Sequence, residues 1–412
     1  MKINRLIAGV IALVAGAAGL FAQNGTISPY SRYGYGLISD NVTSTQGSMG
    51  GVGYAMTSGR QVNVMNPASY ARTDSLTFLF DMGMDMSALW TSETNGTTHN
   101  SDRNFGAGLS YITMQFPINK RMGMSLGLLP YSSVGYAFGS DIDNGASSRS
   151  GDGSINQLYA GVSGRIFGGL TVGVNMSYLF GSTNNYSYAT AEAGDVSLYR
   201  REISVRDWHL TAGLQYSQPI GNDMLTLGFV YSPAKAFLGH ARTYVQNINT
   251  DDSQTEQSSA KLKDGYSMAA TYGAGIGYQL GQKLFLEGDF TYQPWSKEKF
   301  NGVEGALADR YKIALGAQYQ GAQRGSYWRR IQYRLGAFYD RDYLVVGDNN
   351  VRQYGASFGL GLPVPGFKTV VNLGFEWRHR QATPAALVKE DYLNITIGIN
   401  FNEMWFRKNK IY

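Results

Sequence analysis

Apolar and polar residues alternate along most of this chain. The pattern is clearest from Val371 to Arg378 and from Leu393 to Asn402, where every second residue is apolar. Successive side chains of a β-strand point to opposite faces, so a period of two predicts strands with one apolar face. A soluble sheet with one wet face would give the same alternation. Here, however, the second face is small or polar in strand after strand, and little other apolar material is available for a core.

Counting the alternating segments gives about fourteen strands, an even number as in bacterial membrane barrels. They are expected near 75–92, 104–118, 121–137, 154–167, 169–184, 198–218, 223–248, 264–280, 283–299, 309–322, 327–341, 350–362, 368–380 and 391–406. Alternate connections are short, and the others are long and polar, as on the periplasmic and outer sides of such barrels. The sequence therefore predicts an all-β, transmembrane antiparallel barrel over residues 75–406, with a tail at 407–412 and both termini in the periplasm.

Composition favours the same class of protein. The chain has 52 Gly and 29 Tyr among 412 residues, and only 16% of its residues are charged. Aromatic residues gather at both interfaces of membrane barrels. A secreted array of β-sandwiches is the alternative. The net charge of +5 is scattered along the chain, so it indicates no nucleic-acid partner.

The first 22 residues have the pattern of a secretory signal peptide. Lys2 and Arg5 precede an apolar run from Leu6 to Phe21, and Ala22 stands before Gln23. The chain has no cysteine, which excludes a lipoprotein anchor, disulfides, thiolate metal sites and cysteine catalysis. We therefore expect residues 1–22 to direct export.

Residues 23–74 lack the alternation of the later segments. A Gly-rich stretch from Gly47 to Ala71 has neither helical nor strand period, yet it carries apolar side chains that need burial. The pair Asn66-Pro67 favours a turn. We expect residues 23–74 to form a hatch inside the barrel, with these residues as its signature: Met49, Gly50, Gly51, Gly53, Ala55, Asn66, Pro67 and Ala68.

These residues carry a resemblance to a known family. The MGGxGxA run from Met49 to Ala55, followed by the Asn-Pro-Ala at 66–68, resembles the N-terminal hatch of the FadL-type (OMPP1/FadL/TodX) outer-membrane transport family. The opening SPYSRYGYG at 28–36 resembles Bacteroidetes members, including the PorV-like branch attached to type IX secretion. Trp295–Lys297 resembles the family's WSxF loop start, and Tyr327–Tyr339 its W-x-x-R-x-G-x-Y strand. The resemblance covers most of the mature chain.

The resemblance implies passive uptake of hydrophobic small molecules, such as long-chain fatty acids, across the outer membrane. The implied partners are outer-membrane lipid, the hydrophobic ligand and the barrel-assembly machinery, which reads a terminal aromatic residue such as Phe406. No cofactor is implied. The alternative is a PorV-like accessory protein that binds a secretion translocon or secreted proteins, and the fold alone does not decide between the two.

In the FadL-type family, a kink in the third strand opens a lateral window. Pro130 lies in the third predicted strand, and a proline cannot donate to the strand ladder. We therefore expect Leu129, Pro130 and Gly135 to form such an opening. A harmless bulge near the barrel rim is the alternative.

Charged residues mark the lumen side of the later strands, namely Glu287, Asp289, Lys312, Arg334, Glu376 and Arg378. Buried charges are tolerated when they are paired, so we expect these groups to pair with one another, with Arg60 and Arg72 as further partners. The alternatives are that they shape a polar path through the lumen or that they grip the hatch.

Enzyme signatures are weak. None of the four histidines, His99, His209, His240 and His379, has a metal-binding spacing, so no catalytic or metal site is expected. The GAGIG run at 273–277 lies within a strand, where its glycines are expected to make room in the lumen rather than to bind a dinucleotide.

Overall fold

The computed structural model describes residues 28–404, apart from gaps at 96–97, 143–144, 192–195, 238–239, 249–254, 263–264, 323–324, 366–367 and 386. The predicted signal peptide, the terminal aromatic Phe406 and the predicted tail lie outside the described residues.

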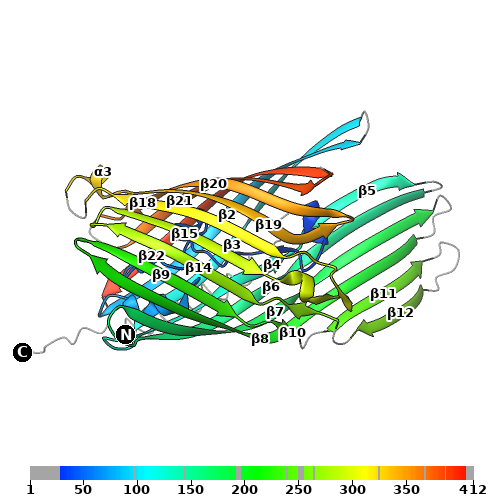
Figure 1. Cartoon of the computed structure of the whole chain (residues 1–412). Coiled ribbons are helices and arrows are strands. Elements are labelled where there is room, and N and C mark those ends of the chain that lie inside the picture. The colour runs from blue at the N-terminus through cyan, green and yellow to red at the C-terminus, as the bar shows by residue number, and fades with distance from the viewer. Residues whose placement is uncertain are drawn as a thin grey trace, which may run out of the picture.

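Fourteen antiparallel strands close into a barrel (Figure 1). In order around the ring they are β2 (Thr77–Asn95), β3 (Thr98–Pro117), β4 (Met122–Ser133), β6 (Gly145–Arg165), β7 (Leu170–Ala191), β8 (Val196–Ile220), β9 (Asp223–Ser232), β14 (Thr271–Leu280), β15 (Leu284–Gln293), β18 (Arg310–Gln320), β19 (Gln332–Val346), β20 (Asn349–Pro363), β21 (Val370–Thr383) and β22 (Val388–Met404). The ring is closed by pairing of β2 with β22. The predicted barrel class and strand number are confirmed.

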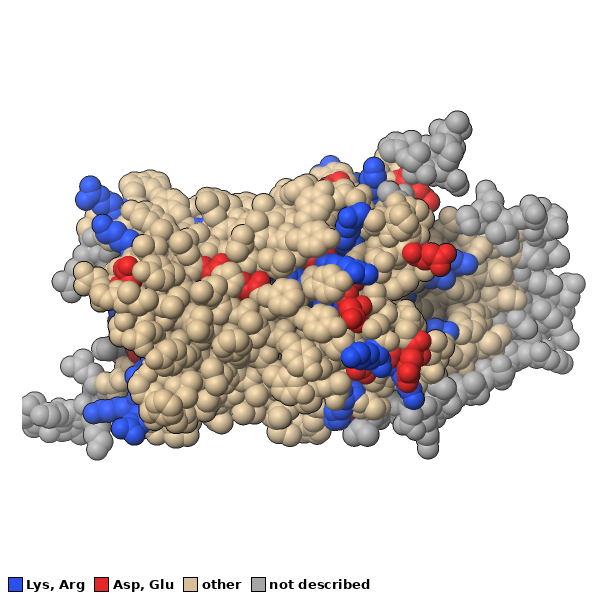
Figure 2. All heavy atoms as spheres, viewed as in Figure 1, with Lys and Arg blue, Asp and Glu red and all other residues tan. Residues whose placement is uncertain are grey.

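The period of two separates the two faces of the wall. On β22, Leu393, Ile397 and Phe401 are 39 to 40% exposed, whereas Asn400 and Asn402 are 3% and 4% exposed. Apolar side chains therefore face outward and polar ones face inward, the reverse of a water-soluble protein. Charged side chains are sparse along the middle of the outer wall and gather near its ends (Figure 2). No helix among the described residues is long and apolar enough to cross a membrane.

Much of what the sequence analysis assigned to long loops is strand. β2 and β3 extend as a hairpin, β5 (Tyr136–Ile142) pairs with β6, and β12 (Thr255–Leu262) lies where a loop was expected. β12 pairs with β11 (His240–Ile248), which falls within the predicted strand 223–248 and continues the sheet from β8. The wall thus rises well beyond the barrel on one side (Figure 1). These extensions carry polar residues on both faces, so they lack the alternation that identified the other strands. We call this the long-hairpin end, and the opposite end the short-turn end.

Several predicted strands are interrupted. The segment 223–248 stops at Ser232, because Pro233 cannot continue the ladder; β10 (Lys235–Ala236) then pairs with β13 (Ser267–Met268). The segment 327–341 begins with a helical turn, α3 (Tyr327–Arg330), and β19 starts only at Gln332. The segment 283–299 ends in a 3-10 turn, η3 (Trp295–Lys297), before the small hairpin of β16 (Lys299–Phe300) and β17 (Val303–Glu304).

Residues 28–76, the N-terminal segment, lie inside the barrel. They form η1 (Pro29–Arg32), β1 (Leu37–Ile38), α2 (Ser44–Gly47) and η2 (Pro67–Arg72). The Ser28 N–H donates to the Gly135 carbonyl after β4, and the Arg72 guanidinium donates to the Gly169 carbonyl in a short turn. The segment therefore runs from the long-hairpin end to the short-turn end before the first wall strand begins.

Candidate functional site in the barrel lumen

An aromatic cluster fills the lumen at the long-hairpin end. The Tyr35 ring lies 5.1 to 6.2 Å, between ring centroids, from four others: Phe237, Tyr266, Trp295 and Phe300. The Tyr35 N–H donates to the Tyr343 hydroxyl at 3.0 Å, and that hydroxyl donates to the Gly36 carbonyl at 2.5 Å. The N-terminal segment closes this end of the lumen by packing apolar rings around Tyr35.

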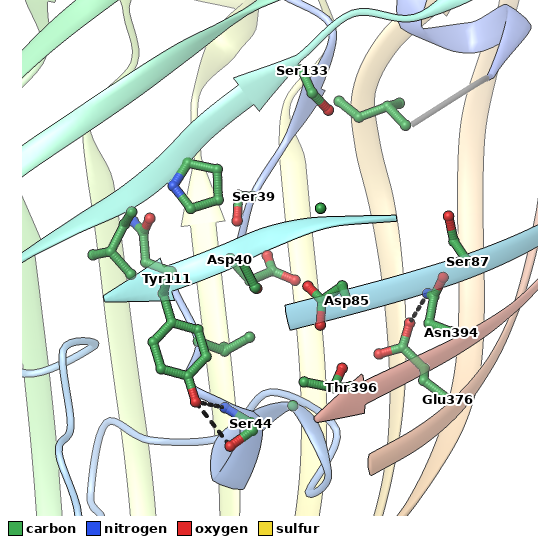
Figure 3. Close-up of a pocket in the computed structure, with 18 of the residues that line it drawn as sticks. Ser39, Asp40, Ser44, Asp85, Ser87, Tyr111, Ser133, Glu376, Asn394 and Thr396 are labelled. Atoms are coloured by element: carbon green, nitrogen blue, oxygen red, sulfur yellow. Dashed lines mark hydrogen bonds between the residues drawn. The ribbon is translucent and has the colours of Figure 1, made fainter. Parts of the chain in front are cut away.

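A cavity of about 320 Å³ lies deeper in the lumen, between the N-terminal segment and β2, β3, β4, β21 and β22 (Figure 3). Apolar Leu37, Leu129 and Pro130 line it, together with the polar residues Asp85, Glu376, Arg378, Asn394 and Thr396. Asp40 and Asp85 both point into it (Figure 3). A second cavity, of about 120 Å³, is lined by Tyr54, His209 and Asp289 among others.

The wall beside the larger cavity is interrupted between β3 and β4. Their pairing ends at Ile112 and Leu128. Beyond that point β4 turns inward, and its Ser132 and Ser133 pair with β1 of the N-terminal segment. Within the described residues, β3 from Thr98 to Tyr111 has no strand partner on this side, and its tip stands apart from β5 in Figure 1.

The residues expected at a lateral opening lie next to this gap. Leu129 and Pro130 line the cavity, and a register shift between Pro130 and Ser132 disturbs the pairing of β4 with β6. Gly135 lies farther along, where its N–H donates to the Ser31 hydroxyl at 3.0 Å. Pro130 accompanies the inward turn of β4 because it offers no N–H to a neighbouring strand.

Ion pairs fix the N-terminal segment to β18. Asp40 accepts from Arg310 and from Lys312, each at 2.7 Å, and Arg310 also pairs with Asp340 at 2.6 Å. Burial opposes ionisation of Asp40, but the charges of Lys312 and Arg310 outweigh it and hold the pKa of this carboxyl group well below its usual range.

The charged residues predicted for the lumen all face it, but their partners differ from expectation. Mutual pairing occurs only between Glu376 and Arg378, at 2.7 Å. Arg334 is fully buried and donates to the amide oxygens of Gln318 and Asn372, each at 2.8 Å. Glu287 and Asp289 accept hydrogen bonds from backbone N–H groups of the N-terminal segment. For Glu287 and Asp289 this is the alternative in which lumen charges grip the hatch, whereas mutual pairing was expected.

The two arginines expected as partners of the lumen charges do not reach them. Arg60 pairs with Asp74 at 3.2 Å, and Arg72 binds a backbone carbonyl, that of Gly169. Both lie near the short-turn end of the N-terminal segment, where the turns supply other acceptors.

The eight residues predicted as a hatch signature belong to the N-terminal segment. Asn66 caps η2 by accepting from the Ala68 N–H at 3.1 Å, and its amide donates to the carbonyls of Tyr54 at 2.7 Å and Leu214 at 3.2 Å. Met49 is fully buried against β18 and β19. Asp40 and Asp85 were missed as cavity residues. Asp85 stands at a polar position of the alternating β2, a signal that could have found it, whereas nothing around Asp40 sets it apart.

Comparisons with known proteins agree with this architecture. The chain is similar in structure to the toluene transporter TodX of P. putida (12% identity, 89% of this chain and 99% of that chain covered, TM-score 0.66). It is also similar to a Pseudomonas aeruginosa FadL homologue (12%, 89% and 99%, 0.62) and to the CymD monoaromatic hydrocarbon channel (14%, 89% and 98%, 0.60). At these identities the likeness establishes a shared fold, the one implied by the FadL-type resemblance.

No curated protein matches this sequence. The family model of BamG matches residues 2–412. Because that match spans nearly the whole chain, the protein belongs to the BamG family.

Proposed function

We propose that this protein is an outer-membrane channel for passive passage of small hydrophobic molecules. The observation that carries the proposal is the gap between β3 and β4 beside the lumen cavity. Leu129 and Pro130 line the cavity where the two strands separate. A molecule held there can leave sideways into lipid and need not cross the aromatic cluster. Movement of the N-terminal segment, acting as the hatch, would connect the cavity with the short-turn end.

The outward-facing apolar belt supports placement in the outer membrane, with the long hairpins outside and the short turns in the periplasm. Strand β2 begins and β22 ends at the short-turn end, where Thr77 pairs with Met404. In this orientation the start of β2 and the end of β22 both face the periplasm.

The charges around the cavity favour an uncharged ligand over a fatty-acid carboxylate. Three carboxyl groups line it, those of Asp40, Asp85 and Glu376. Its two described lining arginines are already engaged, Arg378 with Glu376 at 2.7 Å and Arg380 with Glu390 at 3.2 Å. The carboxylate of a fatty-acid ligand would meet like charges without a free cation, which is unfavourable in a poorly solvated site. TodX and CymD, which share the fold, are described as a toluene transporter and a monoaromatic hydrocarbon channel.

Filling the cavity tests this proposal. Gly108 lines the cavity, and a Cβ built on it has no atom within 4 Å, so the side chain of Gly108→Trp starts into open space. Ala107→Trp is the matched control, because Ala107 is exposed on the opposite face of β3. We expect Gly108→Trp to lower protein-dependent uptake of radiolabelled toluene by cells at least about fivefold, since the side chain occupies much of a small ligand pocket.

Equal uptake by the two variants would contradict the channel proposal. Faster uptake of radiolabelled laurate than of toluene by the native protein would contradict only the preference for uncharged ligands.

A PorV-like accessory role is the second candidate. The aromatic cluster closes the long-hairpin end, and the wall formed by β5 to β8, β11 and β12 rises beyond the barrel as a broad sheet on which a translocon or a secreted protein could dock. Chemical cross-linking in the native membrane would support this role if it captured a stoichiometric protein partner while toluene uptake was absent.

A further inference from the structure

Two acidic side chains of β15 hold the N-terminal segment by its backbone. Asp289 Oδ2 accepts from the N–H groups of Gly53 at 2.7 Å and Tyr54 at 3.0 Å. Glu287 Oε1 accepts from the Ala55 N–H at 2.5 Å. Glu287 and Asp289 are only 4% and 5% exposed. Three consecutive N–H groups therefore share two adjacent buried carboxyl groups.

The neighbouring strands leave room for this contact. Gly275 of β14 lies opposite Asp289, and Gly277 of β14 lies opposite Glu287. A Cβ on Gly275 would lie 2.2 Å from Asp289 Oδ1, so a larger residue would displace the carboxyl group. The GAGIG run thus makes space inside the barrel for the acidic pair and for the chain it binds.

The remaining oxygen of each carboxyl group has no conventional partner. Glu287 Oε2 and Asp289 Oδ1 are both buried and accept no hydrogen bond from any described group. The two residues are two positions apart on β15, so both side chains lie on the same buried face of the strand. Neither forms an ion pair within the described part of the chain.

Few charges face this pair. From β18, Lys312 and Arg310 face it, and both are bound to Asp40, the one acidic group of the N-terminal segment nearby. The facing positions of β14 and β9 are Gly273, Gly275, Gly277, Thr226 and Gly228. Besides Asp40, Tyr54 is the titratable group of the N-terminal segment that lies beside this pair. Burial raises the pKa of its hydroxyl, which keeps the hydroxyl neutral. Two ionised carboxylates side by side, buried and without a dedicated cation, would repel each other strongly.

We propose that Glu287 and Asp289 share one proton, held between Glu287 Oε2 and Asp289 Oδ1, and that this proton fastens the N-terminal segment to β15. The proton converts two orphaned acceptors into one O–H···O hydrogen bond. A single negative charge is left, and the three N–H groups at Gly53, Tyr54 and Ala55 stabilise it. Loss of the proton leaves two like charges under the segment and releases residues 53–55. The release would affect permeation only through the proposed channel function, whereas the proton itself is a property of the fold.

Infrared spectroscopy of the whole protein in D₂O tests whether the proton is present. A protonated carboxyl group has a C=O stretch distinct from that of a carboxylate. We expect the native protein at neutral pH to show such a band, and Glu287→Gln to lack it, because the amide then donates to Asp289, which becomes ionised. Glu376→Gln is the matched control and should keep the band. A native spectrum and a Glu287→Gln spectrum with the same intensity in this region would overturn the shared proton.

Hydrogen exchange tests whether the proton fastens the segment. Gln can accept from Ala55 and donate to Asp289 Oδ1, so Glu287→Gln should keep the native protection of residues 53–55. Glu287→Ala leaves the Ala55 N–H without its acceptor and should speed exchange there at least about tenfold, as in a locally opened region. The peptide covering 66–72 should be unchanged in both variants. Equal protection in Glu287→Ala and the native protein would overturn the fastening role, whatever the result of the toluene assay.

Discussion

The inner face of the wall is shaped residue by residue to receive the N-terminal segment. Gly336, Gly173 and Gly228 face Gly50, Pro67 and Tyr54 respectively, at distances that exclude a side chain. Glycine usually weakens a strand, but here it allows close approach of a second backbone. The positions of these glycines in the wall therefore determine in part where the N-terminal segment can pass.

Gly336→Ala tests this close approach. Its Cβ would lie 2.0 Å from the Gly50 nitrogen, so either the segment or β19 must shift. Overpacking of this kind costs about 1 to 3 kcal/mol or more. We expect a lower unfolding temperature in detergent. The measurement is the temperature at which heating changes the mobility of the protein on a gel. Gly108→Ala, in open space on β3, should leave that temperature unchanged, and an equal effect of the two substitutions would contradict this account.

Asn66→Asp tests the side-chain amide of Asn66, which joins η2 to Tyr54 of the same segment and to Leu214 of β8. Asp keeps the cap on η2 but cannot donate to the carbonyls of Tyr54 and Leu214. The Tyr54 carbonyl keeps the Gln215 amide as a donor at 2.9 Å, so the expected cost is that of the lost Asn66 hydrogen bonds, about 0.5 to 1.5 kcal/mol each. We expect faster hydrogen exchange over residues 53–68. Asn301→Asp, at an exposed loop position, is the control, and unchanged exchange in Asn66→Asp would argue against the link.

At the scale of elements, ion pairs to β18 should make one part of the N-terminal segment sensitive to acid. Asp40 has a pKa held below its usual range by Lys312 and Arg310 against the effect of burial. A carboxyl group with a depressed folded-state pKa contributes stability that is complete above its unfolded pKa of about 3.9 and is lost as the pH falls below it.

We therefore expect hydrogen-exchange protection of residues 37–44, corrected for intrinsic rate, to stay constant from pH 7 to about pH 4 and to fall only in stronger acid. Asp40→Asn should lower that protection already at pH 7, because Arg310 and Lys312 lose a charged partner. A decline in the native protein between pH 7 and pH 5 would show that another group controls this region.

Elements with one apolar and one polar face were predictable, and those without were not. The wall strand around Val371 could be predicted because lipid and lumen impose opposite demands on its two faces. The short helix α3 lies in a predicted strand, and that prediction is wrong because four residues of mixed polarity carry no period. Trp328 of this helix is 74% exposed. The partner of Arg334 could not be predicted, because it depends on side chains of other strands brought together by closure.

At the scale of the whole molecule, the lumen is closed at the long-hairpin end by the aromatic cluster and filled toward the short-turn end by the N-terminal segment. The gap between β3 and β4 lies in the side of the barrel wall, and Pro130 was the main sequence feature that indicated it. Which strands separate is decided by pairing around the whole ring, and no single strand carries that information.

Ion conductance in planar bilayers tests the closure. We expect the native barrel to conduct little and Tyr35→Ala to conduct more, because the cluster loses the ring on which four others pack. Truncation of a buried aromatic side chain to Ala costs about 3 to 5 kcal/mol. Phe105→Ala, on an exposed aromatic residue of β3, is the control. Equal conductance of the Tyr35→Ala and native proteins would place the barrier elsewhere in the lumen.

The pairing of β2 with β22 has a consequence for the order of assembly. This ladder joins the first barrel strand to the last, from Thr77–Met404 to Glu93–Val388, and it surrounds a segment that comes earlier in the chain than either strand. The N-terminal segment is therefore expected to occupy the hollow of the still-open sheet before β22 pairs with β2. If β2 and β22 paired first, the N-terminal segment would have to enter a closed barrel along its axis. A defect in the segment should thus appear as barrels that fail to close.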